Sequence, residues 1–372
     1  AGGLLISPDD PSNVYQLDLI NVTFDKMYGD NQRCFAIYWE AQQISQSSGG
    51  VSITNSPDSS HTGALYLTSR SSSEIRFTFN NWSFINNTAH SMFGGGCGIW
   101  VADLEKRRDL ELIFTDCTWY NNAAKLTIRP GQDPNTPPRP NAYNGLGGGF
   151  QFGFSESNVK TALEFINCLF EDNNADCEGG ALAIQTTKNC RISDCKFIGN
   201  SASKSPGGTF STYSGGAIFI DPDFENTLIT SAKNPDVDIT GCTFENNYAQ
   251  NGCAISVNGS DARININNNQ FINLQGSPNS AVYSVCNEFK FTDNLFRNLG
   301  CRAIEIATKS VITFRNISFD RCQTNDNGGA ILFNPPLTQR LLASEQEYTI
   351  TNCTFKDCGA AKGGSIYISS GV

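Results

Sequence analysis

Long apolar runs are missing from this sequence, and so are the usual residues of metal and redox sites. No stretch approaches the ~18 consecutive apolar residues that a membrane-spanning helix needs, so we expect no membrane span. Histidine occurs only twice, and none of the 14 cysteines forms a CxxC pair with zinc-site spacing. We therefore expect no metal, no cofactor and no catalytic residue.

Apolar residues are also scarce for a chain of this length. Only 39% of the 372 residues are hydrophobic, which is less than a single globular core of that size usually contains. A solenoid tolerates this composition, because its core is a narrow column one side chain deep. The formal net charge of -10 argues against nucleic acid as a partner.

A repeated unit is clearest in residues 237–257. Val237 and Ile239 alternate with polar residues, the pattern of a half-buried strand. A second short strand surrounds Phe244, and a third begins after Gly252-Cys253. No helical segment covers the apolar face of this unit, so it becomes stable only when copies stack on each other.

Copies of the unit recur along the chain and define two columns. An aromatic residue marks the second strand, and in five successive copies an asparagine follows three residues later. In a stack, the aromatics would form an inward column and the amides would hydrogen-bond from coil to coil. The predicted aromatic column contains Phe84, Trp119, Phe170, Phe197, Phe244, Phe271, Phe296, Phe319 and Phe355, and the predicted asparagine ladder contains Asn87, Asn122, Asn173, Asn200 and Asn247.

These repeats predict an all-β fold, a right-handed parallel β-helix solenoid of about eleven coils with three short strands per coil and several loop insertions. Residues 1–13 are polar and contain a proline-rich turn, so we expect a leader segment there. Residues 14–372 are expected to form the parallel β-helix.

Each repeat pairs a Phe-x-x-Asn motif with a Gly-Gly-Ala-Ile motif. Examples are 170–173 with 179–182, and 197–200 with 215–218. This pairing resembles the repeats of the chlamydial polymorphic membrane proteins, and more broadly the right-handed parallel β-helix of the pectate-lyase-like superfold. The resemblance covers about residues 14–368. It implies a β-helix displayed at a surface and used for adhesion.

Sequons and cysteines both bear on the compartment. The 14 cysteines are an even number, as expected for a disulfide-forming, extracellular or cell-surface protein. Four sequons share one repeat position, three residues before the aromatic, although that column also fits any turn residue. We expect a glycoprotein with N-linked glycans; the candidate sites are Asn21, Asn81, Asn86, Asn258, Asn316 and Asn352.

One cysteine pair is predicted to form a disulfide. Cys322 and Cys358 occupy the asparagine-ladder position in adjacent copies, at a corner of the coil. Neighbouring rungs lie about 4.8 Å apart, which falls within the usual Cα separation of a disulfide. Five other cysteines stand two residues before the aromatic, where a thiol can fill a small apolar slot.

The acidic residues give only a weak indication of chemistry. A lyase or hydrolase on this fold would need clustered carboxylates, and the candidates are Glu171, Asp172, Asp176 and Glu178. Acidic loop residues are usually solvated surface. We therefore predict an extracellular structural or adhesive protein that is not an enzyme. The alternative is a carbohydrate-active enzyme, a polysaccharide lyase or hydrolase, or a carbohydrate-binding passenger on the same scaffold.

The end of the stack predicts self-association. The last rung contains Tyr348, Ile350, Phe355, Ile366 and Ile368, and we expect only Ser369–Val372 to be left to cover it. Uncovered strand edges recruit further strands. We therefore expect head-to-tail assembly into a homopolymeric filament, or membership of a longer surface solenoid. A carbohydrate or another cell-surface ligand is left open as a further partner.

Overall fold

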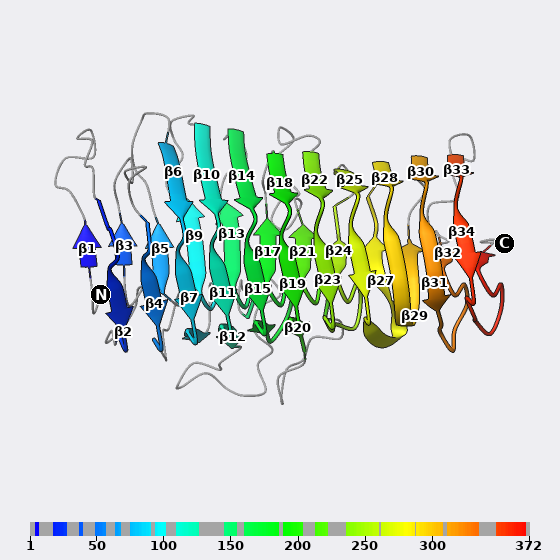
Figure 1. Cartoon of the computed structure of the whole chain (residues 1–372), viewed down its shortest axis with the longest axis horizontal. Coiled ribbons are helices and arrows are strands. Elements are labelled where there is room, and N and C mark those ends of the chain that lie inside the picture. The colour runs from blue at the N-terminus through cyan, green and yellow to red at the C-terminus, as the bar shows by residue number, and fades with distance from the viewer. Residues whose placement is uncertain are drawn as a thin grey trace, which may run out of the picture.

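The computed structural model describes residues 4–6, 18–27, 37–39, 49–56, 64–67, 75–90, 94–101, 109–125, 145–154, 160–185, 189–203, 213–221, 236–259, 262–286, 288–307, 311–334 and 347–369. All regular elements in these ranges are strands, stacked along an elongated rod with the two chain ends at opposite ends (Figure 1). The paired strands run parallel. The predicted right-handed parallel β-helix is confirmed.

Each full coil contributes strands to three sheets. Sheet 1 contains β6 (Ile75–Asn80), β10 (Asp109–Thr115), β14 (Lys160–Ile166), β18 (Asn189–Ser193), β22 (Asp236–Thr240), β25 (Arg263–Asn267), β28 (Glu288–Thr292), β30 (Val311–Arg315) and β33 (Glu347–Thr351). Sheet 2 contains β2 (Thr23–Asp25), β4 (Ser52–Thr54), β7 (Ser83–Ile85), β11 (Thr118–Tyr120), β15 (Leu169–Glu171), β19 (Lys196–Ile198), β23 (Thr243–Glu245), β26 (Gln270–Ile272), the first part of β29 (Leu295–Ile306), β31 (Ser318–Cys322) and β34 (Thr354–Lys356).

Sheet 3 closes each coil, and a small fourth sheet forms part of one corner. Sheet 3 contains β1 (Leu4–Ile6), β3 (Ile37–Trp39), β5 (Leu65–Leu67), β9 (Cys97–Val101), β13 (Phe150–Phe154), β17 (Leu182–Gln185), β21 (Ile218–Asp221), β24 (Ile255–Val257), β27 (Gln275–Ser284), the last part of β29, β32 (Ile331–Phe333) and β35 (Ile366–Ile368). The small sheet contains β8 (Thr88–His90), β12 (Ala123–Lys125), β16 (Asn174–Ala175) and β20 (Ser201–Ala202).

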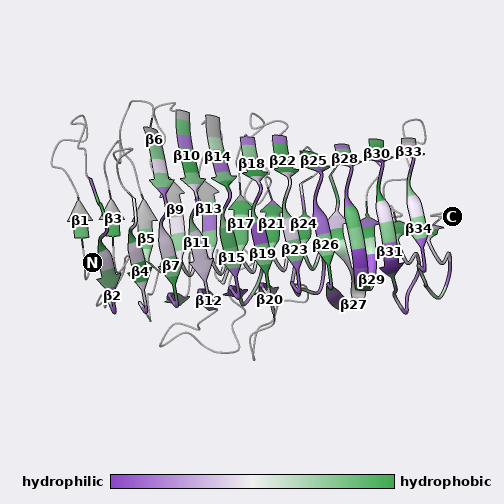
Figure 2. Ribbon diagram, in the orientation of Figure 1, coloured by the Kyte–Doolittle hydropathy of each residue, from purple (hydrophilic) through white to green (hydrophobic). Residues whose placement is uncertain are grey.

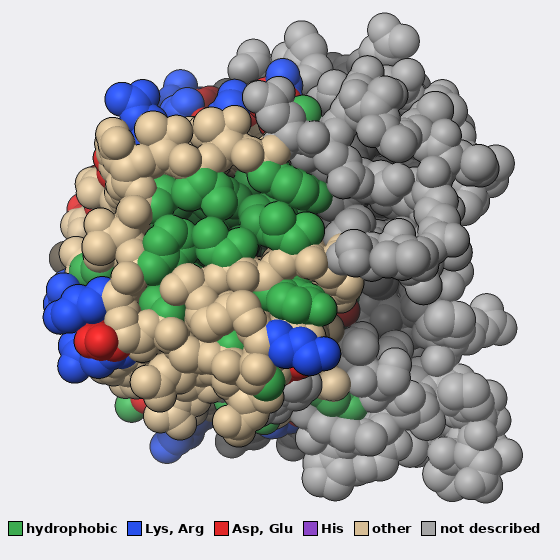
Figure 3. Space-filling view, turned by 90° about the vertical axis from the view of Figure 1, so that its right-hand side faces the viewer, with side chains coloured by type: hydrophobic (Ala, Val, Ile, Leu, Met, Phe, Trp, Pro, Cys, Tyr) green, Lys and Arg blue, Asp and Glu red, His purple; other side chains and the backbone are tan. Residues whose placement is uncertain are grey.

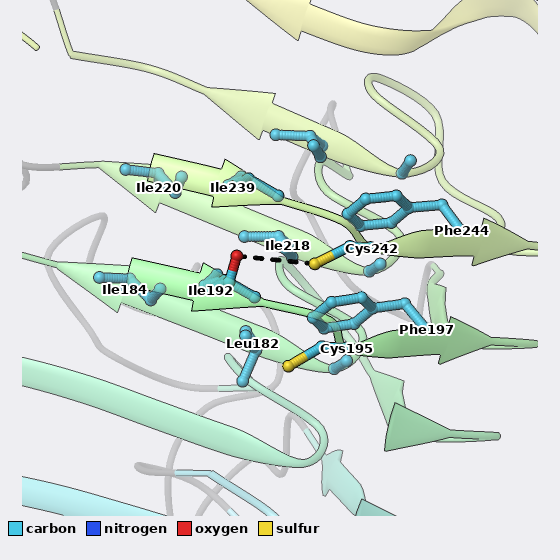
Figure 4. Close-up of a cluster of buried hydrophobic side chains, with 14 of the residues drawn as sticks. Leu182, Ile184, Ile192, Cys195, Phe197, Ile218, Ile220, Ile239, Cys242 and Phe244 are labelled. Atoms are coloured by element: carbon cyan, nitrogen blue, oxygen red, sulfur yellow. Dashed lines mark hydrogen bonds between the residues drawn. The ribbon is translucent and has the colours of Figure 1, made fainter. Parts of the chain in front are cut away.

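The core is a column of inward side chains enclosed by the three sheets. In β22, Val237 and Ile239 are buried, whereas Asp236, Asp238 and Thr240 are partly exposed. Figure 2 shows hydrophobic and hydrophilic residues alternating along many of the strands. Figure 4 shows apolar side chains from neighbouring coils meeting inside; these include Leu182, Ile192, Phe197, Ile218, Ile239 and Phe244.

The aromatic residues of sheet 2 form one continuous stack. From Phe84 to Phe355, neighbouring ring centroids lie 4.5–5.2 Å apart, with interplanar angles of 4–13°. This spacing follows the separation of neighbouring strands in a sheet. The column also contains Phe24, and Ile53 replaces the ring in the coil between Phe24 and Phe84. The rings are therefore held at strand spacing by the backbone ladder itself.

Two glycines make the close turn that precedes sheet 3. Gly179 has a φ of +66°, a left-handed conformation that most side chains disfavour. A Cβ on Gly180 would lie 2.1 Å from the carbonyl oxygen of Gly216 in the next coil. The Gly-Gly-Ala-Ile motif is thus required by a turn and by the close approach of neighbouring coils.

The leader segment contains a strand. Leu4–Ile6 forms β1, which pairs in parallel with β3 and places Leu4 beside Ile37. Within the described residues, sheet 3 therefore starts one strand earlier than sheet 2. Ile37 is 1% exposed, so the strand extends the core by one apolar layer at this face.

Candidate functional site

The C-terminal end of the stack presents an apolar surface. Figure 3 looks onto this end and shows a patch of hydrophobic side chains, bordered above and below by other side chains and backbone. Phe355 and Ile366 are partly buried, whereas Ile350 is 38% and Ile368 is 61% exposed. The equivalent rings inside the stack, such as Phe244 and Phe319, are 0% exposed. The last rung thus resembles an interior rung with one face uncovered.

The first strand of sheet 2 has the same pattern of exposure. In both β2 and β34 the central phenylalanine is partly buried and its two neighbours are exposed. In the interior strand β23 the phenylalanine is fully buried and its neighbours are partly buried. Among the described strands, β2 pairs only with β4 and β34 only with β31. Within the described residues, both ends of sheet 2 are therefore open edges.

Four predicted glycosylation sites form a column along one edge of the rod. Asn21, Asn81, Asn316 and Asn352 are exposed and lie between sheet 1 and sheet 2, with φ values of 53–55°. The same left-handed conformation occurs in this column where no sequon exists; examples are Asp116, Asn167, Asp194, Gly241 and Asn268. The turn geometry therefore accounts for asparagine, aspartate and glycine in the column.

Two other sequon asparagines hydrogen-bond through their side chains. Asn86 donates from Nδ2 to Asn55 Oδ1 at 3.1 Å and accepts from Asn121 at 2.8 Å. It thus belongs to an exposed amide ladder outside the buried one. Asn258 donates from Nδ2 to Asp221 Oδ2 at 3.1 Å.

The predicted asparagine ladder lies at a buried corner. Asn200, for example, donates from Nδ2 to Asn247 Oδ1 at 3.0 Å and to the Phe170 carbonyl oxygen at 2.9 Å. Its own Oδ1 accepts from Asn173 Nδ2 at 3.0 Å. Each amide therefore bridges three coils, and the same pattern links Asn87, Asn122 and Asn173.

A second buried asparagine ladder, which the sequence analysis did not predict, lies in later coils. Asn269 donates to Asn294 Oδ1 at 3.1 Å and to the Ile239 carbonyl oxygen at 2.9 Å. Both asparagines stand two residues before the column aromatic, in the position that Cys195 and Cys242 hold in earlier coils. The sequence signal that could have predicted this ladder is the pair of successive asparagines in the cysteine column.

The predicted disulfide between Cys322 and Cys358 is wrong. Both residues are free thiols, as are the other described cysteines. Equivalent positions in neighbouring coils have parallel Cα–Cβ bonds, an unfavourable geometry for an S–S bond. Cys358 instead donates to the Phe319 carbonyl oxygen at 3.7 Å. The neighbouring Cys358 thiol and burial raise the pKa of Cys322.

The acidic residues of the coil at 171–178 separate into two places. Glu171 and Asp172 lie on the outside of sheet 2, whereas Asp176 is buried and pairs with Lys125 at 3.6 Å. Burial and the charge of Asp221 raise the pKa of Glu178 to about 8. The protonated form of Glu178 is therefore favoured at neutral pH.

Arg302 forms a buried ionic cluster that the sequence did not predict. It replaces the second glycine of the Gly-Gly motif and is 1% exposed. Its guanidinium group donates to the Asn327 carbonyl oxygen at 2.9 Å and to Asp326 at 3.2 Å, and also to Glu305. Because these acceptors balance its charge, Arg302 does not present a free cation.

The described residues contain no group of three or more histidine, cysteine or acidic side chains that could hold a metal ion. No helix in this part of the chain is long and apolar enough to cross a membrane. Comparison of the sequence with protein-family models and with curated proteins gives no match.

Proposed function

We propose that this chain is an extracellular structural or adhesive rod that assembles end to end or lies within a longer surface solenoid. The observation that carries this proposal is the pair of open ends. Interior members of the sheet 2 column, such as Ile53, Phe84 and Phe319, are fully buried, whereas Phe24 and Phe355 are only partly buried. A second β-rung would cover both the apolar surface and the free strand edges.

An extracellular or cell-surface location is the second part of the proposal. It now rests on the sequons, because the described cysteines are free and do not by themselves indicate an oxidising compartment. Asn21, Asn81, Asn316 and Asn352 are exposed at one edge, where attached N-linked glycans would leave the sheet faces free. A carbohydrate or cell-surface ligand on those faces is part of the adhesive proposal.

We also propose a relationship to the chlamydial polymorphic membrane protein repeats. Its support is that both halves of the shared motif have defined structural roles. Phe170 and Asn173 supply the ring column and the amide ladder, and Gly179-Gly180 makes the turn before sheet 3. These structural roles support a shared fold. They do not indicate a shared function, which depends on the residues at the surface.

The proposed role needs no catalysis. One feature favours the alternative, a carbohydrate-active enzyme: burial and the charge of Asp221 raise the pKa of Glu178 to about 8, and a carboxyl group with a raised pKa can act as a general acid. Release of reducing ends or unsaturated products from uronic-acid polymers by the wild type, but not by Glu178→Gln, would favour that alternative. We expect no turnover with either protein.

Sedimentation velocity tests the proposed assembly. Across rising concentrations of the chain, we expect a series of longer rods that dissociate on dilution. A single sedimenting species of monomer mass at all concentrations would contradict assembly of this chain. Intact mass before and after enzymatic deglycosylation of secreted protein tests the location and the glycans independently.

A further inference from the structure

The first and last rungs of the chain place apolar residues in the same three columns. Strand pairing runs along sheet 2 from β2 to β34 and along sheet 3 from β1 to β35. The register between β27 and β29 shifts between Gln275 and Ser280, but the column continues through the pair Val282 and Ile304. The bridges of Ile20 and Gly49 continue sheet 1 to its start. A second copy stacked in phase on the last rung would therefore continue each column. In sheet 1, Leu19 of the second copy would face Ile350 of the first, and in sheet 2, Phe24 would face Phe355. In sheet 3, Leu4 of the second copy and Ile366 of the first would occupy the same position.

The charges beside these columns are inverted between the two ends. The first strand of sheet 2 and its turn read Thr-Phe-Asp-Lys at 23–26, and the last read Thr-Phe-Lys-Asp at 354–357. The turn residues Lys26 and Asp357 share a left-handed conformation, with φ values of 52° and 53°. Stacked in phase, Lys356 faces Asp25 and Asp357 faces Lys26.

An ion pair of this kind already exists inside the chain. Arg297 and Asp320 are register partners on neighbouring coils, in the same column as Asp25 and Lys356. The Nε atom of Arg297 lies 3.6 Å from Asp320 Oδ2. Hydrogen bonds from Asn55 and Thr54 lower the pKa of Asp25, so its carboxylate is charged at neutral pH. The geometry of the column thus allows opposite charges on successive rungs to pair.

The backbone ladder can continue across the same junction. Within the chain, Ser52 N donates to the Val22 carbonyl oxygen at 2.9 Å, and Lys26 N donates to Thr54 O at 3.0 Å. The same pattern ends at Thr354 N, which donates to Ile317 O at 2.8 Å. Continued by one rung, it pairs Thr23 N of one copy with Cys353 O of the other.

One strand must be displaced for this register. Sheet 3 begins one strand before sheet 2, so β1 of one copy and β35 of the other would occupy the same place beside β3. Backbone hydrogen bonds hold the turn before β35, from Gly329 N to Gly364 O at 3.0 Å and from Ala330 N to Ser365 O at 2.9 Å. Among the described strands, β1 pairs with β3 alone. The strand that leaves is therefore β1.

We propose that a second copy of this chain docks its first rung on the last rung of the first copy, with Lys356 facing Asp25, Asp357 facing Lys26, and β35 in the place of β1. This inference rests on the end-to-end assembly of the proposed function and defines its register. In this account β1 covers the first core layer until another copy supplies β35. Because the added ion pairs are exposed, assembly weakens as salt rises.

Charge reversal at the turn position tests the register. Lys26→Asp places two negative charges opposite each other at the junction, and Asp357→Lys places two positive charges there. Because like charges repel, the association constant of each variant alone should fall about tenfold in sedimentation velocity. An equimolar mixture of the two variants restores opposite charges at every mixed junction and should recover wild-type association. Asp172→Lys and Lys196→Glu, which lie in the interior of the stack, are matched controls and should assemble like the wild type.

The removal of residues 1–6 tests the displaced strand and should strengthen association about tenfold, because no exchange of β1 is then needed. Melting at monomer concentration confirms that each variant is folded. If both charge-reversal variants and their mixture associate with the wild-type association constant, this register is wrong, but end-to-end assembly is not contradicted. Absence of any assembly by the wild type and by the chain without residues 1–6 would contradict the proposed assembly itself.

Discussion

Side-chain amides fix the corner between sheet 2 and the small sheet. Asn200 is 0% exposed and its Nδ2 group donates to Phe170 O and Asn247 Oδ1. An aspartate there keeps the acceptor but loses both donors and places a charge among carbonyl oxygens. Asn200→Asp should therefore lower the free energy of unfolding by at least about 3 kcal/mol in urea titrations.

Asn246→Asp is the matched control for that substitution. It introduces the same charge at the neighbouring exposed turn residue, where aspartate tolerates the φ of 55°. We expect it to change stability by less than about 0.5 kcal/mol. Equal destabilisation by the two variants would show that charge, rather than the buried ladder, is responsible.

Glu178 makes stability depend on pH. Its folded-state pKa of about 8 lies above the ordinary value of 4.5, so the folded chain binds this proton more tightly than the unfolded chain. Its contribution is fully present below pH 4.5 and is lost as the pH rises toward 8. The unfolding free energy of the wild type should fall as the pH rises through this range. In Glu178→Gln this fall should be smaller, by up to about 1.4 kcal/mol per pH unit.

Urea titrations between pH 5 and pH 8 measure this effect. Glu171→Gln, on the outside of sheet 2, is the control and should keep the wild-type slope. If the unfolding free energy of Glu178→Gln falls with pH as steeply as that of the wild type, then the pKa of Glu178 is not raised in the folded chain.

At the scale of single strands, the sheet 2 phenylalanines provide a position-dependent test. Phe244 is fully buried between Phe197 and Phe271, so Phe244→Ala should cost about 3–5 kcal/mol. Phe355 has a ring partner on one side only among the described residues and is partly buried. Phe355→Ala should cost clearly less when unfolding is measured at monomer concentration. Equal losses would contradict the open end.

Strand periodicity made the fold predictable, because repeated residues at a fixed phase reveal a column. The aromatic column and the corner turn at Asn81 follow from such repetition. Features that occur once or twice gave a weaker signal than a column that repeats along the chain. The Asn269–Asn294 ladder, the buried Arg302 cluster and the strand at Leu4–Ile6 belong to this class.

The cysteine error has a different cause. Sequence position correctly placed Cys322 and Cys358 on neighbouring coils, since Phe319 pairs with Phe355 and Gln323 bridges to Gly359. Coil spacing alone does not decide bonding, because the direction of each Cα–Cβ bond also matters. Parallel strands repeat that direction from coil to coil, so a ladder position favours thiol donation to a backbone carbonyl.

At the scale of the whole molecule, glycans should decorate one edge of the rod. Asn21, Asn81, Asn316 and Asn352 share the exposed corner between sheet 1 and sheet 2. Peptide mass spectrometry of protein secreted from eukaryotic cells should find these asparagines modified. If all four are unmodified, the left-handed turn alone explains the asparagines, and the extracellular proposal loses its main support.

Electron microscopy of the purified chain tests the central claim most directly, which is that open β-helix ends stack on one another. We expect unbranched filaments one rod wide, with lengths in multiples of a unit on the order of 50 Å, set by about eleven rungs of ~4.8 Å. The filaments should shorten on dilution and in high salt. Single rods at all concentrations, or rods joined along their sides, would contradict the account.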